Sequence, residues 1–176
     1  MFKGAGSFNQ ALGRWEVDNV QTMGYMFRSA TSFNQDLSDW RLNSVTSMIH
    51  MFYHSSAFDQ DLGWCVDDGV DLEEAFSNTS CASTSCGVGV KGVSCALPSP
   101  KPTVTQAPTH APSPAPTVTA APTVLDCSGV AHLGPVMNDT SLRAAVAAWL
   151  KEARRVAVCR YGDIATWDTH LVTDMS

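Results

Sequence analysis

The pair Met-Phe recurs at residues 1–2, 26–27 and 51–52, a spacing of 25 residues each time. Further residues repeat in the same register: Phe8, Phe33 and Phe58; Gln10, Gln35 and Gln60; Leu12, Leu37 and Leu62; Trp15 and Trp40; Val17 and Leu42; Val20 and Val45; Met23 and Met48. A period of this length is typical of repeat proteins. One unit is too short to bury its own apolar face, so neighbouring units must bury these faces against each other. The sequence therefore predicts an α/β repeat solenoid, with the repeated apolar residues in its core.

Two periods alternate within one unit. Apolar residues at steps of three and four predict a short helix or helical turn over residues 21–31 of the second copy. Trp40 and Leu42 are two apart, as on a strand, so residues 39–43 are expected to form a short strand that pairs in parallel with its copies. The repeated Gln is preceded each time by a turn-forming residue, whose side chain can satisfy backbone groups where the coil turns. These turn residues are Asn9, Asn34 and Asp59.

The third copy departs from the pattern after Leu62. Its tryptophan, Trp64, comes one residue early, and acidic residues crowd into residues 67–74. Terminal repeats are often atypical because they cover the exposed end of the core with a polar face. Residues 1–96 are therefore expected to form an array of about three coils, in which residues 62–96 are a cysteine-containing C-terminal cap.

Two further segments follow the array. Residues 97–124 hold eight of the nine prolines in a Thr/Ala/Ser background, which predicts a disordered or extended Pro/Thr linker. Residues 125–176 begin with an amphipathic helix whose expected N-cap is Asp139 or Thr140.

The end of this segment repeats the array's pattern once more. Ile164, Trp167, Val172 and Met175 follow the spacing of the residues that begin at Leu12, at a constant offset of 152. Residues 125–176 are therefore expected to be a helical N-terminal cap and the first coil of a second, truncated array, in a fragment of a longer protein.

The cysteines and two glycosylation motifs favour an oxidising, secretory setting. The sequons begin at Asn78 and Asn138. The spacing of Cys81 and Cys86 is near that of a zinc pair, but the other cysteines form no second tight pair, so disulfides are favoured and their pairing stays open. The disulfide candidates are Cys65, Cys81, Cys86, Cys95, Cys127 and Cys159. We expect an extracellular or cell-surface location, with a signal peptide upstream of Met1.

The sequence gives little support to nucleic-acid binding, membrane spanning, nucleotide binding or metal binding. The net charge is −6 with no basic stripe, which argues against nucleic acid, and no apolar run approaches the roughly 18 residues of a membrane span. The G-x-G-x-x-G match at residues 87–92 lacks a βαβ context. His50 and His54 are four apart without a third metal ligand, and residues 67–74 lack the order of an EF-hand. We therefore expect no enzyme, and no catalytic, cofactor-binding or metal-binding residues.

The unit resembles that of the BspA-like leucine-rich-repeat surface proteins, whose repeat is also called the mycoplasma lipoprotein-type repeat or DUF285. It is written here as MFKGAGSFNQALGRWEVDNVQTM and MFRSATSFNQDLSDWRLNSVTSM. The resemblance covers residues 1–76 and 141–176; it departs from the usual pattern at residues 169–171. It implies a leucine-rich-repeat-like solenoid, a surface or secreted location and a role in adhesion or partner binding, with no catalytic residues.

The leading hypothesis is a non-enzymatic surface or secreted module that binds an extracellular protein or glycan through exposed positions that vary between copies. Such positions include Lys3, Arg14, Glu16, Arg28, Asp39 and Arg41. Two alternatives are a purely structural spacer of a wall or matrix, and a binding appendage of a larger enzyme.

Overall fold

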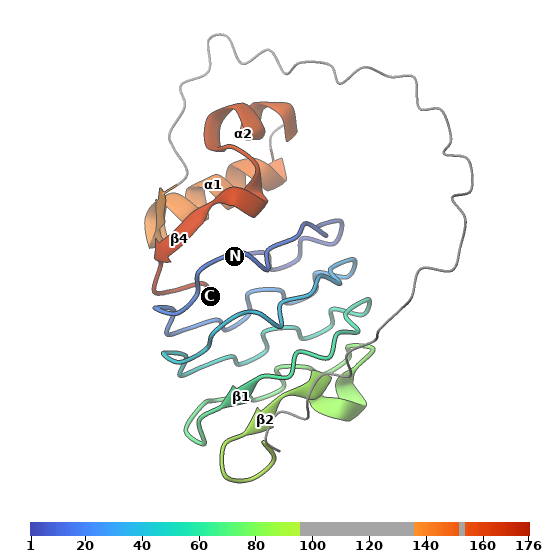
Figure 1. The fold of residues 1–176 in the computed structure, drawn as a ribbon. Helices are drawn as coiled ribbons and strands as arrows, with labels where there is room; N and C mark the ends of the chain where they lie inside the picture. The colour runs from blue at the N-terminus through green and yellow to red at the C-terminus, as the bar shows by residue number, and fades with distance from the viewer. Residues whose placement is uncertain (96–135, 152–153) are drawn as a thin grey trace, which may run out of the picture.

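The computed structural model describes residues 1–95, 136–151 and 154–176 (Figure 1). The regular elements are short: β1 (Cys65–Val66), a 3-10 helix (Ala82–Gly87), β2 (Gly89–Val90), β3 (Val136–Asn138), α1 (Asp139–Lys151), α2 (Arg154–Tyr161), a second 3-10 helix (Ile164–Thr166) and β4 (Asp168–Leu171). β1 pairs in parallel with β2, and β3 with β4. The linker expected over residues 97–124 lies outside the described residues.

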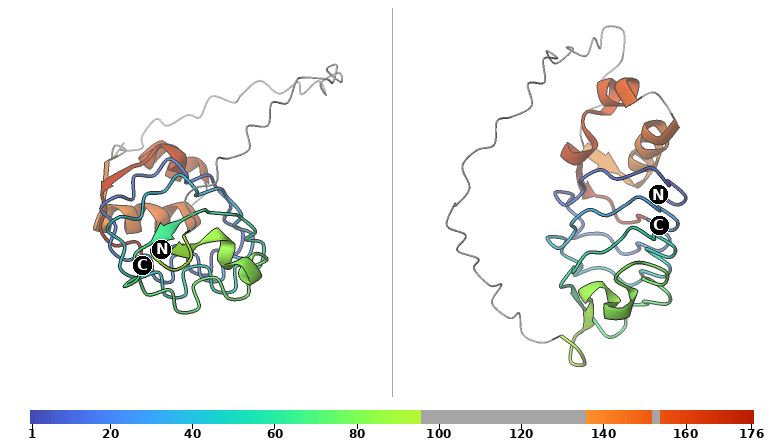
Figure 2. Two further views of the ribbon diagram at one scale, coloured as in Figure 1. Left: turned by 60° about the horizontal axis from the view of Figure 1, so that its bottom comes forward. Right: turned by 90° about the vertical axis from the view of Figure 1, so that its right-hand side faces the viewer.

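The repeated segments lie one above another, as Figure 1 and the right-hand view of Figure 2 show. We call them layers: the second layer is residues 11–35, the third is residues 36–60 and the fourth is residues 61–86. The first layer has two parts, because residues 164–176 lie on residues 12–24 while residues 1–10 lie on residues 26–35. A row of parallel bridges runs through all four layers and joins Asp174, Thr22, Ser47 and Asp71.

The segment 21–31 forms tight turns, so the helix expected there is not present. Alternate backbone N–H groups donate to the next layer: Tyr25 to Ile49 O (2.9 Å), Phe27 to Met51 O (2.9 Å) and Ser29 to Tyr53 O (2.8 Å). The N–H groups between them donate three residues back: Met26 to Met23 O, Arg28 to Tyr25 O and Ala30 to Phe27 O. Because half of the donors bond sideways, an i to i−4 ladder cannot form. This alternation places apolar side chains inward at the same steps of three and four that a helix would give.

Residues 39–43 themselves form no strand, and in the second and third layers the parallel bridges occur at Thr22 and Ser47. In the fourth layer, however, β1 follows Trp64 at the equivalent position and pairs in parallel with β2. Around Trp40 the layers are joined by the indole side chains. Trp15, Trp40 and Trp64 each donate Nε1–H to a carbonyl of the layer above, at 2.8, 3.0 and 3.1 Å. Trp64 keeps this bond despite its early position, because Gly63 takes a left-handed conformation (φ 60°) that shortens the corner.

The first layer has no layer above it, and its tryptophan differs accordingly. The buried Nε1 of Trp167 has no hydrogen-bond partner among the described residues. Its ring is covered edge-on by Trp149 of α1 and Tyr161 of α2, each at 6.1 Å between centroids. The helices therefore close the core with aromatic contacts.

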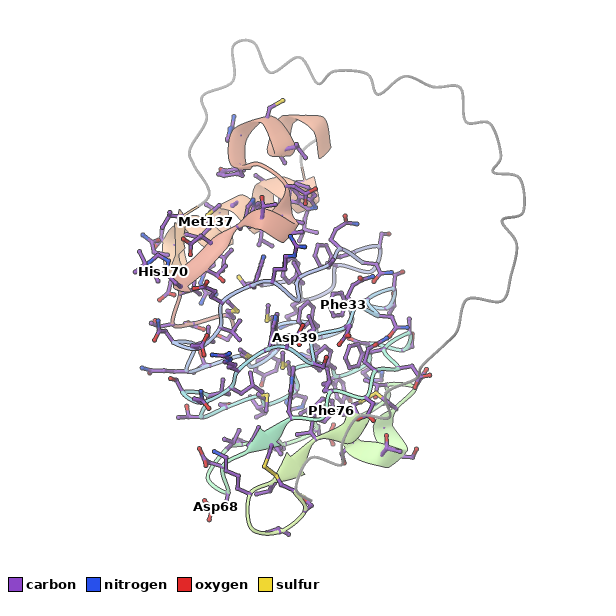
Figure 3. All side chains as sticks on the ribbon, viewed as in Figure 1. Phe33, Asp39, Asp68, Phe76, Met137 and His170 are labelled. Atoms are coloured by element: carbon purple, nitrogen blue, oxygen red, sulfur yellow. A yellow bond between two sulfur atoms is a disulfide. The ribbon has the colours of Figure 1, made fainter. Side chains whose placement is uncertain are left out.

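Phenylalanine rings fill the interior in two columns, which include Phe33 and Phe76, labelled in Figure 3. One column is Phe2, Phe27, Phe52 and Phe76, and the other is Phe8, Phe33 and Phe58. Within one column the centroids of neighbouring rings are 5.2–6.0 Å apart, and all seven rings are at most 8% exposed. Such aromatic contacts add stability beyond the apolar area that they bury. The interpretation of the repeated apolar residues as core is confirmed.

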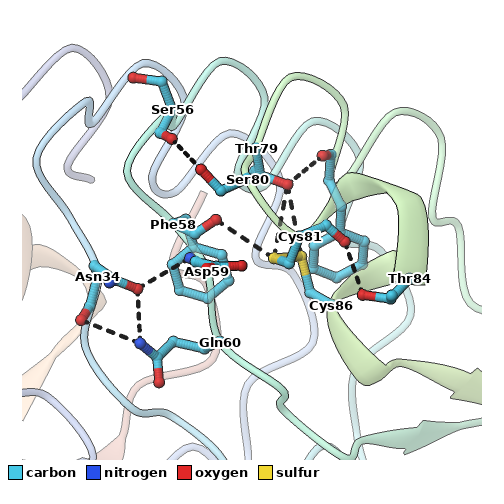
Figure 4. The surroundings of a disulfide bond; sticks show 11 residues. Asn34, Ser56, Phe58, Asp59, Gln60, Thr79, Ser80, Cys81, Thr84 and Cys86 are labelled. Atoms are coloured by element: carbon cyan, nitrogen blue, oxygen red, sulfur yellow. Dashed lines mark hydrogen bonds between the residues drawn. A yellow bond between two sulfur atoms is a disulfide. The ribbon is translucent and has the colours of Figure 1, made fainter.

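Asparagine side chains join the layers at the corner that follows the second phenylalanine (Figure 4). The Oδ1 of Asn9 accepts from Asn34 N–H (3.0 Å) and from Gln35 Nε2 (2.8 Å). The Oδ1 of Asn34 accepts in the same way from Asp59 N–H (3.0 Å) and Gln60 Nε2 (2.7 Å). The expected role of these side chains at the turn is confirmed, and their partners lie in the adjacent layer.

Two disulfides close the lower end of the stack. They give two of the cysteine pairings that the sequence left open. Cys81 pairs with Cys86 beside Phe58. Cys65 of β1 pairs with Cys95, just beyond β2. Cys159 is also disulfide-bonded, while Cys127 lies outside the described residues.

The upper end is closed by β3, α1, α2 and β4. Asn138 is the N-cap of α1, because its Oδ1 accepts from Thr140 N–H (3.1 Å) and Ser141 N–H (2.9 Å); the expected caps lay one and two residues later. Residues 164–176 were expected to begin a second array, and they instead supply the layer above Trp15. The departure at Thr169 is accommodated because its buried hydroxyl donates to Glu16 O at 2.9 Å.

The asparagine contacts can be tested by substitution. Asn34→Ala leaves Asp59 N–H and the Gln60 amide without their acceptor, so we expect the free energy of unfolding to fall by about 1–2 kcal/mol. Denaturant titration of both proteins measures the difference. Asn43→Ala is the matched control, since Asn43 is exposed and its side chain makes no hydrogen bond within the part of the chain that the structure describes. Equal losses in both variants would contradict the role of Asn34.

A pH dependence is expected where the first layer meets the second. Burial alone would raise the pKa of the Asp174 carboxyl, but hydrogen bonds from Ser176 and Thr22, and the charge of Arg143, hold it below the ordinary value of 3.8. Its contribution to stability is therefore complete above that value and is lost as the pH falls through the lower, folded pKa. Unfolding free energies measured from neutral pH downwards should fall less steeply below pH 3.8 for Asp174→Asn than for the unchanged protein. Identical slopes would contradict this assignment.

Candidate interaction surface

Two positions have left-handed backbone in the second, third and fourth layers, on either side of the Met-Phe pair or its equivalent Ala75-Phe76, and one of them is also left-handed in the first layer. The first holds Tyr25 (φ 60°), His50 (φ 53°) and Glu74 (φ 48°), and the second holds Gly4 (φ 74°), Ser29 (φ 57°), His54 (φ 60°) and Asn78 (φ 61°). This conformation suits glycine and asparagine but costs most residues roughly 1 kcal/mol or more. The middle layers nevertheless carry tyrosine and histidine there. Strained residues that persist in this way concentrate at functional sites.

Cationic and aromatic side chains interleave on this side of the stack. Lys3 Nζ lies 5.3 Å from the centroid of the Tyr25 ring. The guanidinium of Arg28 lies over two tyrosine rings, 5.8 Å from the Tyr25 centroid and 5.3 Å from the Tyr53 centroid. These are cation–π distances. Each cation is thus held over a ring.

The histidines extend the same array of rings. Tyr25 and His50 are stacked at 5.2 Å with an interplanar angle of 4°, and His50 meets Tyr53 edge-on at 5.0 Å. Tyr53 in turn meets His54 edge-on at 4.2 Å. The buried Nδ1 of His50 has no hydrogen-bond partner among the described residues. We call these six side chains the aromatic–cation strip: Lys3, Tyr25, Arg28, His50, Tyr53 and His54.

The charge of this side changes along the stack. The strip runs from Lys3 in the first layer to His54 in the third. In the fourth layer the equivalent segment carries Glu73 and Glu74, both exposed, next to the His50 backbone. A cationic end and an acidic end therefore lie on one side of the molecule.

A cavity of about 490 Å³ opens at the cationic end of the strip. It lies between residues 3–10 and α1, and Lys3, Phe8, Gln10, Trp149 and Leu150 contribute to its lining. Its volume is in the range of small-molecule sites. Lys3 belongs both to this cavity and to the strip, so the two form one continuous surface.

The exposed positions singled out from the sequence divide between two places. Lys3 and Arg28 belong to the strip, whereas Arg14, Glu16, Asp39 and Arg41 line a separate hollow of about 400 Å³ near Trp15. Sequence reasoning missed Tyr25 and Tyr53 as surface residues. The signal was present, because Tyr53 follows Arg28 at the repeat spacing, as Arg28 follows Lys3.

The structure shows where the other residues considered as possible sites lie and what they contact. His50 and His54 are engaged with the tyrosine rings. Gly87 has left-handed backbone (φ 74°), and a Cβ there would lie 1.8 Å from Asp61 Oδ1, so close packing accounts for this glycine. In the acidic run, Asp67 pairs with Lys91 at 2.8 Å. The sequon residues Asn78 and Asn138 are both exposed.

One cluster was not foreseen. Glu16, Asp168 and His170 each place a potential metal-ligand atom within 4.8 Å of the others. The hydrogen bond from His170, together with its charge, lowers the pKa of the Asp168 carboxyl. Glu16 and His170 are exposed, and groups of this kind are common on surfaces without a metal, so we assign no ion to them.

Comparison with known proteins agrees with the repeat pattern. No helix in the described parts of the chain combines the length and apolarity needed to cross a bilayer. No curated protein and no solved structure matches the chain. Residues 1–87 match a family described as "Mycoplasma protein of unknown function, DUF285". This is the repeat family that the Met-Phe and Phe-Asn-Gln motifs resemble, and residues 1–87 of this chain belong to the DUF285 family.

Proposed function

We propose that this chain is a non-enzymatic binding module that acts outside the cell or at its surface. It recognises an extracellular protein or glycan through one side of a solenoid. The aromatic–cation strip is the observation that carries this proposal, because it combines tyrosine and arginine, the residue types that dominate binding hot spots. Its side chains are already held in place by one another, so little conformational entropy is lost on binding.

The setting supports an extracellular role. Disulfides such as Cys65–Cys95 and Cys81–Cys86 form and persist in oxidising compartments. A purely structural spacer is the competing proposal, but a spacer has no use for tyrosine and histidine at positions where glycine or asparagine would be less strained.

The experiment uses the full chain produced with its disulfides intact. Binding to a panel of extracellular-matrix proteins and glycans is measured for the unchanged protein and for Tyr53→Ser/His54→Asn. These changes install the residues that the fourth layer carries at the same positions, Ser77 and Asn78, so the fold should tolerate them. We expect saturable binding that weakens about tenfold or more in the variant, since truncated hot-spot side chains typically cost over 1–2 kcal/mol.

The control is Asp39→Asn/Arg41→Gln, which alters exposed residues in the separate hollow. Thermal melts establish that all three proteins are folded. Saturable binding lost in the control but kept in the strip variant would overturn the assignment to the strip. An absence of saturable binding to the whole panel would favour the spacer.

A further inference from the structure

We infer that the aromatic–cation strip binds an anionic polysaccharide whose chain lies along the stacking direction, over the first three layers. This inference rests on the proposed function and adds the chemical class of the partner. Four observations carry it: the pairing of the cations with rings, their lack of counter-charges, the spacing of the layers, and the acidic boundary at the fourth layer.

Among the residues that the structure describes, the two cations of the strip have no protein counter-ion. Lys3 and Arg28 are in no salt bridge within the described residues, whereas Lys91 and Arg143 each pair with an aspartate. Arg14 and Arg41 are likewise in no salt bridge within these residues, so the neighbouring tyrosine rings are what sets Lys3 and Arg28 apart. The cationic end of the strip is therefore available to an anion from outside.

The position of Arg28 suits an anion. Its guanidinium lies over the rings of Tyr25 and Tyr53, and these contacts use no hydrogen-bond acceptor, so its N–H donors remain available to an anion. A planar fork of donors matches the oxygens of a carboxylate or sulfate, which it can bind through two hydrogen bonds. The tyrosine rings supply the stacking that holds the fork in place.

The spacing favours a polysaccharide over an acidic peptide. Lys3 and Arg28 occupy the same register position in adjacent layers, and stacked strip rings such as Tyr25 and His50 are 5.2 Å apart. An extended peptide presents side chains on one face only every 6.4–6.8 Å or so, which does not match this spacing. Consecutive pyranose rings are closer together than the alternate side chains of an extended peptide, so one sugar ring can lie over each layer. The acidic groups that face the strip then meet Lys3 and Arg28.

The ends of the strip limit where the chain can lie. Glu73 and Glu74 repel an anion beyond the third layer. At the other end, Lys3 is shared with the cavity of about 490 Å³ beside Trp149. The polysaccharide is therefore expected to run from the third layer toward α1, with a terminal sugar at the cavity.

The test measures binding of the full chain to four soluble polymers by isothermal titration calorimetry. Polygalacturonate carries carboxylates on sugars, heparin carries mainly sulfates, dextran is neutral, and polyglutamate is a peptide polyanion. Two variants remove the same charge: Lys3→Gln/Arg28→Gln alters the strip, and Arg14→Gln/Arg41→Gln alters exposed arginines elsewhere. Circular-dichroism melts verify that both variants fold.

We expect polygalacturonate or heparin to bind and dextran and polyglutamate to bind much more weakly. The strip variant should lose about tenfold or more in affinity, because charge-assisted hydrogen bonds are worth roughly 1.5–3 kcal/mol each. Its binding should also depend less steeply on salt concentration, since fewer polymer charges are neutralised. The arginine control should keep its affinity within about twofold, since its charges lie outside the strip.

Three results would overturn the inference: no binding to either anionic polysaccharide, equal losses in the two variants, or tighter binding to polyglutamate. The first of these leaves the proposed function intact if the matrix panel yields a partner that depends on Tyr53 and His54. Failure of both experiments removes the binding role itself.

Discussion

The structure depends on backbone hydrogen bonds that run between layers. Residues 1–64 contain only turns and isolated bridges, so a layer has almost no regular structure of its own. Its N–H and C=O groups are satisfied by groups of the adjacent layer. Phe27 N–H donates to Met51 O, and Phe52 N–H donates to Ala75 O. Since each layer is ordered by its neighbours, both ends of the stack must be closed. Disulfides close one end, and α1 and α2 close the other.

This lateral register also determines the surface. The alternation of sideways and backward hydrogen bonds requires left-handed residues on both sides of the Met-Phe pair. Those residues project next to their equivalents in adjacent layers, so a ring in one layer is placed against a ring or a cation in the next. The stacking of Tyr25 on His50 follows from this arrangement. The hydrogen bonds between layers that order the core thus also align the side chains available to a partner.

Much of the interior could be predicted from the sequence, because a residue that repeats in register has the same surroundings in every layer. The buried phenylalanines and tryptophans and the asparagine contacts follow in this way. The local backbone could not be predicted: steps of three and four arise both from a helix and from alternating turns, and only the lateral bonds distinguish them. Disulfide pairing and the two-part first layer depend on contacts between distant segments. The strip was recognised only in part: Lys3 and Arg28 were named as exposed, but the left-handed backbone at Tyr25 and His50 leaves no mark in an apolar pattern.

The corner at Gly63 shows how such a stack can change during evolution. The fourth layer has lost one residue between Leu62 and Trp64 relative to the interval from Leu37 to Trp40, yet the indole keeps its bond to Leu37 O. Insertions and deletions should therefore be accepted where a single glycine can redirect the chain. Between Met23 and Ala30, where alternate amides bond to the next layer, a change of one residue would exchange inward and outward side chains. Among related sequences, insertions and deletions are therefore expected at corners such as that of Gly63 and not in the segment from Met23 to Ala30.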